Sequence, residues 1–283
     1  MRIIITLWQG LCHLPTSWHP TMGRLLGKFL LIVAKDRKKI AQANISLCLS
    51  NLSADDQKKI LSNNFALLGK SIIETGIAWF WSDAKIEKFI DYEIFGLDLL
   101  SIENSTKGNL IIFKHSQHLE LDARLLAINA EVYGVSRSHN SASMNKIQNK
   151  GRLSSIKGTA DKDNPRKFIK WLKNGKNVLY AIDQDYGWDN SAKLKFFNQE
   201  TATITTPKKI IDITGSNLLF MNSYYEKNKI VLKLEALNSF GIDNKGLSQK
   251  INDFMEEKIL IHPAEYLWAH RRFKSTLGRS FYK

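Results

Sequence analysis

Short, fully apolar runs alternate with helical patterns between residues 109 and 244. The clearest runs are NLIIF (109–113) and NVLYAID (177–183), and between them an amphipathic pattern over 165–176 begins near a proline. A strand without a polar face is buried on both sides, as in parallel sheets that helices cover. The alternation therefore predicts an α/β fold, with a mostly parallel or mixed sheet flanked by helices.

The other elements follow from the same two periodicities. The expected helices cover 40–88, 95–108, 121–130, 165–176, 205–216 and 245–263, and the expected strands cover 109–113, 132–137, 177–183, 217–226 and 229–237. The chain has no internal repeat and no Pro/Gly-rich linker. We therefore expect residues 40–283 to form a single α/β domain.

Residues 1–39 combine apolar runs with tryptophans and positive charges. The runs lie at the start of the chain and at 25–34, and the cluster KDRKK (35–39) follows the second. Neither run reaches the roughly 18–20 apolar residues that span a bilayer. We expect this segment to associate with the membrane interface, its basic cluster on the cytoplasmic side. The alternative is a pair of amphipathic helices packed on the core.

The charge of the chain favours a polyanionic partner. The formal net charge is +14, from 41 Lys and Arg against 27 Asp and Glu. Nucleic acid, an anionic membrane surface and an acidic protein are the candidate partners. No nucleic-acid-binding motif is present, and the two cysteines, Cys12 and Cys48, are too few for a zinc cluster or a disulfide framework.

The segment KHSQHLELDAR (114–124) contains the densest group of reactive side chains. Its first histidine, His115, follows the apolar run 109–113 directly, and chemistry in open α/β sheets is usually placed at the carboxyl ends of strands. A metal site with His118 lacks the HExxH spacing and further ligands. His118 and Asp122 have i,i+4 spacing, which predicts a surface or capping pair. The third hypothesis is that the carboxylate of Glu120 holds one ring nitrogen of His115 and makes the other a general base.

Several further motifs, taken together, resemble one enzyme family. They are HPTMGRLLGKFL, ANISLCLSNLS, LLGKSIIETGIAWFW, FKHSQHLELDARLL, NKGRL, AIDQDYG, KFFNQETATITTP and YLWAHRRFK. In this order and spacing they resemble the late acyltransferases of lipid A biosynthesis (lauroyl/myristoyl type), which add secondary acyl chains to lipopolysaccharide precursors. The resemblance covers roughly residues 8 to 277. It implies a fold like that of the glycerolipid acyltransferases.

The resemblance implies roles for five residues of the proposed site, one of which is the base. The H-x-x-x-x-E motif of the family falls on His115 and Glu120, which would activate the hydroxyl of the substrate. Arg152 would place a fixed guanidinium on a phosphate or on the developing oxyanion. One of Asp183 and Asp185 would orient the dyad or Arg152.

Two basic segments are expected to bind substrate. Arg137 and His139 resemble a family segment that could contact a phosphate or a sugar acid. His270, Arg271 and Arg272 could contact a lipid headgroup or the carrier protein. The alternative for the second group is a solvated basic edge.

The resemblance implies transfer of a fatty acyl chain from acyl carrier protein to a hydroxyl of a 3-hydroxyacyl chain on a Kdo-bearing lipid A precursor. Acyl carrier protein, the anionic glycolipid and the membrane surface would be the partners, at the cytoplasmic face of the inner membrane of a Gram-negative bacterium. No metal, cofactor or acyl-enzyme is required. The alternatives are an acyltransferase with another glycolipid or phospholipid acceptor and, in a different class, a basic nucleic-acid-binding protein.

Overall fold

A seven-stranded sheet forms the centre of the computed structural model, which describes residues 2–101, 107–136 and 142–283. The strands in the sheet are β1 (Tyr92–Phe95), β2 (Asn109–Phe113), β3 (Val132–Ser136), β4 (Thr159–Asp161), β5 (Asn177–Ala181), β8 (Asn217–Glu226) and β9 (Lys229–Ala236). Their order is β1-β9-β8-β2-β5-β3-β4. The strands from β8 to β4 are parallel to one another, whereas β9 and β1 run in the opposite direction. The predicted mostly parallel sheet is confirmed.

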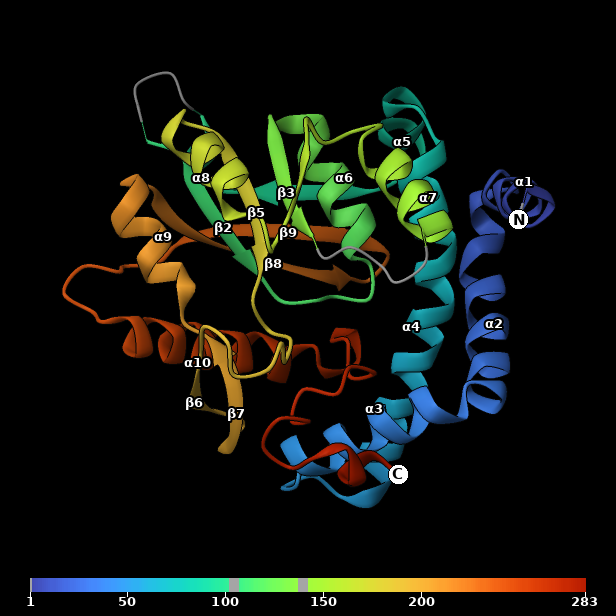
Figure 1. Ribbon diagram of the computed structural model, residues 1–283. Coiled ribbons are helices and arrows are strands. Elements are labelled where there is room, and N and C mark those ends of the chain that lie inside the picture. The colour runs from blue at the N-terminus through green and yellow to red at the C-terminus, as the bar shows by residue number, and fades with distance from the viewer. Residues whose placement is uncertain (1, 102–106, 137–141) are drawn as a thin grey trace.

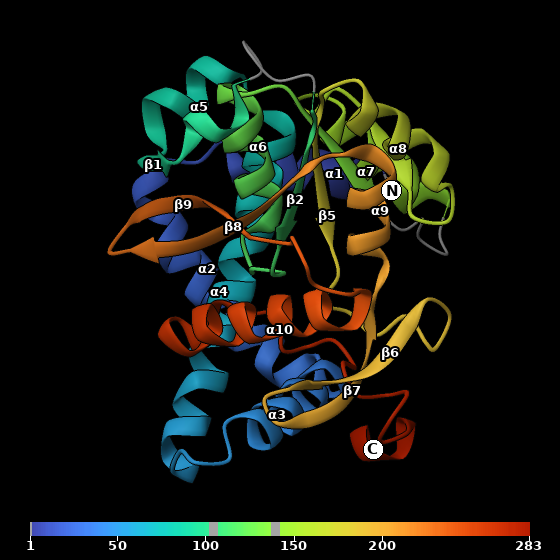
Figure 2. The same ribbon diagram turned by 90° about the vertical axis from the view of Figure 1, so that its left-hand side faces the viewer.

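Helices cover both faces of this sheet. The described residues form the helices α1 (Arg2–Cys12), α2 (His19–Val33), α3 (Lys35–Cys48), α4 (Ala54–Phe80), α5 (Asp83–Phe89), α6 (Leu119–Asn129), α7 (Ala142–Arg152), α8 (Pro165–Lys173), α9 (Thr206–Thr214) and α10 (Asn244–Ile261). Of these, α1, α2 and α3 pack on α4. Figure 2 shows α5 and α6 on one side of β2 and β5, with α8 and α9 on the other. The predicted α/β class with flanking helices is therefore confirmed.

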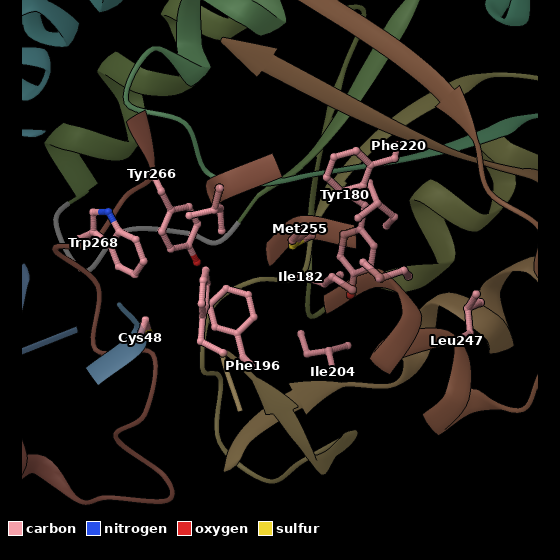
Figure 3. Close-up of a cluster of buried hydrophobic side chains, with 14 of the residues drawn as sticks. Cys48, Tyr180, Ile182, Phe196, Ile204, Phe220, Leu247, Met255, Tyr266 and Trp268 are labelled. Atoms are coloured by element: carbon pink, nitrogen blue, oxygen red, sulfur yellow. The ribbon is translucent and has the colours of Figure 1, made fainter. Parts of the chain in front are cut away.

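Alternate side chains of the central strands enter two separate cores. In β2, Leu110 and Ile112 belong to a cluster with side chains of α8, α9 and α10, part of which Figure 3 shows. Ile111 and Phe113 belong to a second cluster with side chains of α4 and α6. All four residues are at most 7% exposed. A strand buried on both faces explains why β2 reads as a continuous apolar run.

The N-terminal helices pack along the long helix α4. Figure 1 shows α2 and α4 side by side. Glycines permit the close approach, since a Cβ atom on Gly69 would lie 2.1 Å from the carbonyl oxygen of Gly23 and 2.4 Å from the backbone nitrogen of Gly27. Most of residues 2–39 are therefore helical, and α2 has one face packed against the protein, as in the alternative of packed amphipathic helices.

The outer faces of α1 and α2 expose large apolar side chains. On α2 the most exposed are Ile32 at 71% and Leu25 at 61%, and on α1 Ile3 at 77% and Leu7 at 64%. Among the described residues no helix is both long enough and apolar enough to cross a membrane. The outer faces of α1 and α2 therefore form an exposed apolar surface.

The short elements were not predicted. They are α7, β1, β4, and an antiparallel hairpin of β6 (Ser191–Phe196) and β7 (Gln199–Ile204), whereas α5 lies almost entirely within the region 40–88 that was expected to be helical. The hairpin turns at Phe197 and Asn198, both with positive φ, and only Asn among these two is a usual signal for that conformation. The helix expected at 95–108 is only a 3₁₀ turn at Leu97–Leu100, and residues 102–106 lie outside the described part.

Candidate active site

His115 and Asp183 lie side by side at the carboxyl ends of adjacent strands. Strands β2 and β5 pair in parallel with Phe113 opposite Ala181, and each functional residue follows two positions later. Asp183 accepts a hydrogen bond from the backbone N–H of His115 at 2.8 Å and another from ring Nδ1 at 2.5 Å. One buried carboxylate therefore fixes both the turn and the imidazole orientation.

The hydrogen bonds also fix the tautomer of His115. Because Asp183 accepts from Nδ1, the other nitrogen, Nε2, carries the lone pair. The side-chain amide of Gln184 donates to this Nε2 at 3.2 Å. Burial alone would raise the pKa of Asp183, but the positive charge of the His115 ring when it is protonated and the two hydrogen bonds from His115 outweigh burial and lower that pKa to about 2. The carboxylate is thus ionised when Nε2 acts as a base.

Glu120 does not hold His115, in contrast to the predicted dyad. Its carboxylate accepts from Nε of Arg152 at 3.1 Å to each oxygen, and also from the Nη2 group of Arg152. The indole N–H of Trp79 donates to Glu120 at 2.9 Å. The prediction failed because the last turn of α7, which was not expected, brings the guanidinium to the first turn of α6.

His115 and the Glu120–Arg152 pair line one cavity of about 690 Å³. His115, Gln184, Glu120 and Arg152 belong to its polar lining, which also includes Arg37, Ser136, Gln148, Ser155, Thr159, Lys162, Tyr180, Tyr186 and His270. The apolar lining comes from α4, α6, the central strands and later segments, and it consists of Leu68, Ala78, Trp79, Phe113, Leu119, Ala123, Val135, Ile156, Leu179, Ala181, Ile204, Leu267 and Ala269. The arrangement places a base and a cation beside a space suited to a hydrocarbon chain.

The turn that carries His115 is held by residues far along the chain. The backbone N–H of Leu267 donates to the carbonyl of His115 at 2.9 Å, and that of Gln117 donates to Glu265 at 2.8 Å. Ser116 and Tyr266 form an antiparallel bridge between these two bonds. The segment 265–267 therefore completes the turn that carries His115.

His118 is a buried residue of this turn, not part of a surface pair. Its Nδ1 contacts Asp122 at 2.6 Å and its Nε2 contacts Glu265 at 3.3 Å, and the imidazole is 2% exposed. Burial lowers its pKa, but the two carboxylates outweigh burial and raise the pKa to about 9. Within the described part of the chain, no cluster of His, Cys, Asp and Glu is arranged to hold a metal ion.

This raised pKa predicts a loss of stability at alkaline pH. A group whose pKa rises from 6.5 to about 9 on folding stabilises the native state fully below pH 6.5, and this contribution disappears as the pH rises through 9. We expect the free energy of unfolding to fall across this window by up to about 3 kcal/mol more in wild type than in His118→Gln. Urea unfolding at pH 6.5, 8 and 9 measures both proteins, and equal slopes would contradict the expectation.

The two aspartates of the DQD segment have different partners. Whereas Asp183 contacts His115, Asp185 accepts from the backbone N–H and hydroxyl of Ser275 at 2.8 and 2.7 Å. It also accepts from the backbone N–H of Gly187 at 2.9 Å. Asp185 therefore stabilises a turn, and of the two aspartates it is Asp183 that contacts His115.

The three residues of the basic segment 270–272 lie in three different environments. Arg272 is 2% exposed and donates to Ala202 and to the hydroxyls of Thr201 and Thr203, so the predicted substrate contact is wrong for this residue. The hairpin β6–β7, which was not predicted, encloses its guanidinium. Arg271 is exposed and does not line the cavity. The other predicted contacts, Arg137 and His139, lie outside the described residues.

His270 lines the cavity as a neutral ring. Burial is the main cause that lowers the pKa of its imidazole to about 3, and the charge of Asp183 opposes this only in part. Its Nδ1 is buried and has no hydrogen-bond partner among the described residues. At neutral pH His270 can therefore offer a substrate a neutral imidazole, but not the positive charge that the sequence suggested.

Gln184 and Trp79 are site residues that the sequence analysis missed. Gln184 lies between the two aspartates that were singled out, and Trp79 lies in the quoted motif ending AWFW. Neither residue type titrates, so a search for acids, bases and cations passes over both. Only their positions could have indicated them, because Gln184 follows the end of a strand and Trp79 lies near the end of a helix.

Comparison with known proteins agrees with the resemblance in the motifs. The model of the bacterial lipid A biosynthesis acyltransferase family matches residues 2–275. Lipid A biosynthesis palmitoleoyltransferase of Escherichia coli is 31% identical over 278 residues, covering 96% of this chain and 89% of that protein. Lipid A biosynthesis lauroyltransferase of Escherichia coli is 32% identical over 267 residues, covering 91% and 86%. The myristoyltransferase of the same organism is 20% identical over 286 residues, covering 96% and 85%.

These matches define the protein as an acyltransferase. The chain belongs to the bacterial lipid A biosynthesis acyltransferase family. Its activity is thus acyl transfer in lipid A biosynthesis, and relatives in Escherichia, Shigella and Haemophilus fit a Gram-negative source.

Proposed function

We propose that this enzyme transfers a fatty acyl chain from the thioester of acyl carrier protein to a hydroxyl of a 3-hydroxyacyl chain on a Kdo-bearing lipid A precursor. The observation that carries the proposal is the cavity of about 690 Å³, in which Nε2 of His115, beside the amide of Gln184, adjoins an apolar lining. A long acyl chain and an aliphatic hydroxyl both fit such a site. A metal, a bound cofactor or an acyl-enzyme is not needed for this reaction.

In the proposed mechanism His115 is the general base. Nε2 removes the proton of the acceptor hydroxyl, in the place where the amide of Gln184 donates to it. The oxygen attacks the thioester carbonyl, the C–S bond breaks, and the proton passes from the imidazolium to the leaving thiolate. Buried, ionised Asp183 stabilises the imidazolium at its Nδ1.

Arg152 is the proposed cation of the site. Its Nε and Nη2 bind Glu120, and its Nη1 donates to none of the described residues. Nη1 is therefore free to donate to the developing oxyanion or to a phosphate of the acceptor. In this proposal Glu120 orients the guanidinium and does not itself remove a proton.

The donor chain is proposed from the relatives. The two relatives that are 31% and 32% identical are named palmitoleoyltransferase and lauroyltransferase, whereas the myristoyltransferase is 20% identical. We therefore expect this enzyme to prefer chains of the lauroyl and palmitoleoyl types. The net charge of +14 suits an acidic carrier protein and an acceptor with phosphates and Kdo carboxylates.

The exposed apolar faces of α1 and α2 are the proposed contact with the inner membrane, at its cytoplasmic side. Leu25, Phe29 and Ile32 recur on one face of α2, next to exposed Arg24 and Lys28. Apolar side chains beside cations are typical of helices at an anionic lipid surface. Co-sedimentation with vesicles of anionic phospholipid tests this, and protein that stays in the supernatant would contradict it.

Mass spectrometry tests the proposed reaction. Wild-type and His115→Ala enzymes are incubated with a Kdo-bearing lipid A precursor and a series of acyl carrier protein thioesters. The proposal expects a mass gain of one acyl chain with wild type, lost in the variant, and the mass identifies the chain. A gain only on another glycolipid or on phospholipid would contradict the proposed acceptor, and a gain that persists in His115→Ala would contradict the proposed base.

A further inference from the structure

Trp79 contacts Glu120 and packs against Gly151, the residue before Arg152. Its indole N–H donates to Glu120 at 2.9 Å. Its ring packs so closely on the turn before Arg152 that a Cβ atom on Gly151 would lie 2.4 Å from two ring carbons of Trp79. The end of α4 therefore fixes the carboxylate directly and touches the backbone that carries the guanidinium.

Trp8 of α1 packs against Trp79 from the other side. The ring centroids are 5.5 Å apart and the planes make an angle of 71°, an edge-to-face contact. The indole N–H of Trp8 donates to the carbonyl of Ile72 at 2.8 Å, which ties the ring to α4. A series of contacts thus runs from Trp8 through Trp79 to Glu120 and Arg152.

Helix α1 crosses α4 at Gly76. A Cβ atom there would lie 2.2 Å from Sγ of Cys12 and 3.0 Å from Nε1 of Trp8, so only glycine permits this approach. A different face of α1 exposes Ile3, Leu7 and Leu11 at 77%, 64% and 47%. Figure 1 shows α1 at the edge of the molecule. The helix therefore presents one face to the surroundings and another to the support of the site.

We propose that Trp79 is a positioning residue for the Glu120–Arg152 pair, and that α1, through Trp8, holds Trp79 in the position that this role needs. Helix α1, whose outer face is apolar, then also supports the active site. This inference rests on the proposed role of Arg152 in acyl transfer. It predicts that loss of the contact between Trp8 and Trp79 lowers kcat even when substrate binding is intact.

The kinetic test separates positioning from packing. Trp79→Phe keeps an aromatic ring against Trp8 and removes the N–H that donates to a carboxylate. We expect kcat to fall about tenfold or more, with KM for both substrates within about twofold and Tm nearly unchanged. Trp8→Leu is expected to lower kcat in the same way but less. The double variant should be no slower than Trp79→Phe alone, because both changes act through one contact.

Gln9→Ala is the matched control on α1, since the Gln9 side chain is exposed and is not one of the apolar side chains proposed to contact lipid. Assayed in detergent micelles, it should keep the wild-type kcat. Wild-type kcat in Trp79→Phe, or additive losses in the double variant, would overturn the inference.

A spectroscopic measurement tests the same contacts without turnover. The chain has 7 Trp, and 5-fluorotryptophan labelling gives each a fluorine resonance. The Trp79 resonance, assigned by its absence in Trp79→Phe, should shift in Glu120→Gln and in Trp8→Leu but not in Gln9→Ala. Absence of both shifts would overturn the inference. If wild type transfers no acyl chain, the proposed function fails, and the fluorine shifts alone decide whether the contacts exist in solution.

Discussion

An Asp183→Asn variant is expected to lose about 10³- to 10⁴-fold in kcat, with KM close to that of wild type. The carboxylate accepts two hydrogen bonds from His115 and stays ionised, because the charge and hydrogen bonds of His115 lower its pKa to about 2. An amide can turn its NH₂ group toward Nδ1, which selects the tautomer with a protonated Nε2. It also gives the imidazolium no counter-charge. Steady-state kinetics with acyl carrier protein thioesters measures the loss.

Asp185→Asn is the matched control for this variant. Its carboxylate is as deeply buried but binds Ser275 and Gly187, away from the cavity lining. We expect it to lower Tm and to leave kcat within a few-fold of wild type. If Asp183→Asn kept kcat within tenfold of wild type, the role of Asp183 in catalysis would be wrong.

Changes to the Glu120–Arg152 pair are expected to have the second largest effect. Arg152→Lys should lower kcat about 10²- to 10³-fold, because an ammonium cannot bind Glu120 through two nitrogens and donate to an oxyanion in the same fixed plane. Glu120→Gln should lower kcat about 10²-fold by releasing the guanidinium. The double variant should lose little more than Arg152→Lys alone, since both act on the same group.

The surface pair Lys208–Asp212 of α9 supplies the control for this experiment. Asp212→Asn breaks an ion pair that is far from the cavity lining, and activity should stay within twofold of wild type. Additive losses in Glu120→Gln and Arg152→Lys would contradict a shared role. A raised KM for the acceptor with an unchanged kcat would instead indicate that Arg152 binds the acceptor.

The position of His115 could be predicted from sequence, because an apolar run that ends in a polar turn marks the carboxyl end of a buried strand. The same argument places Asp183 at the end of the run 177–183. That β2 and β5 are neighbours is a property of the sheet order, which local patterns do not contain. The choice of Asp183 over Glu120 as partner of His115 follows from that order.

The errors in the basic segments have a common physical cause. A guanidinium counts as a surface charge in a sequence unless the groups that enclose it are known. Thr201 and Thr203, which enclose Arg272, come from a hairpin whose turn has no strong glycine signal. Arg152 was expected near the site, but its partner was not, because α7 is polar and gives no apolar periodicity.

The pairing of residues 265–267 with the His115 turn affects how the protein becomes active during synthesis. Helix α1 is made first, and α4 and β2 follow, so the exposed apolar faces of the early helices can meet lipid while translation continues. The segment that bonds to His115 and Gln117 is made long after that turn. Under the proposed membrane contact and mechanism, a ribosome-bound chain can therefore reach lipid before the turn of His115 is complete, and acyl transfer would begin only when the late segment has folded back.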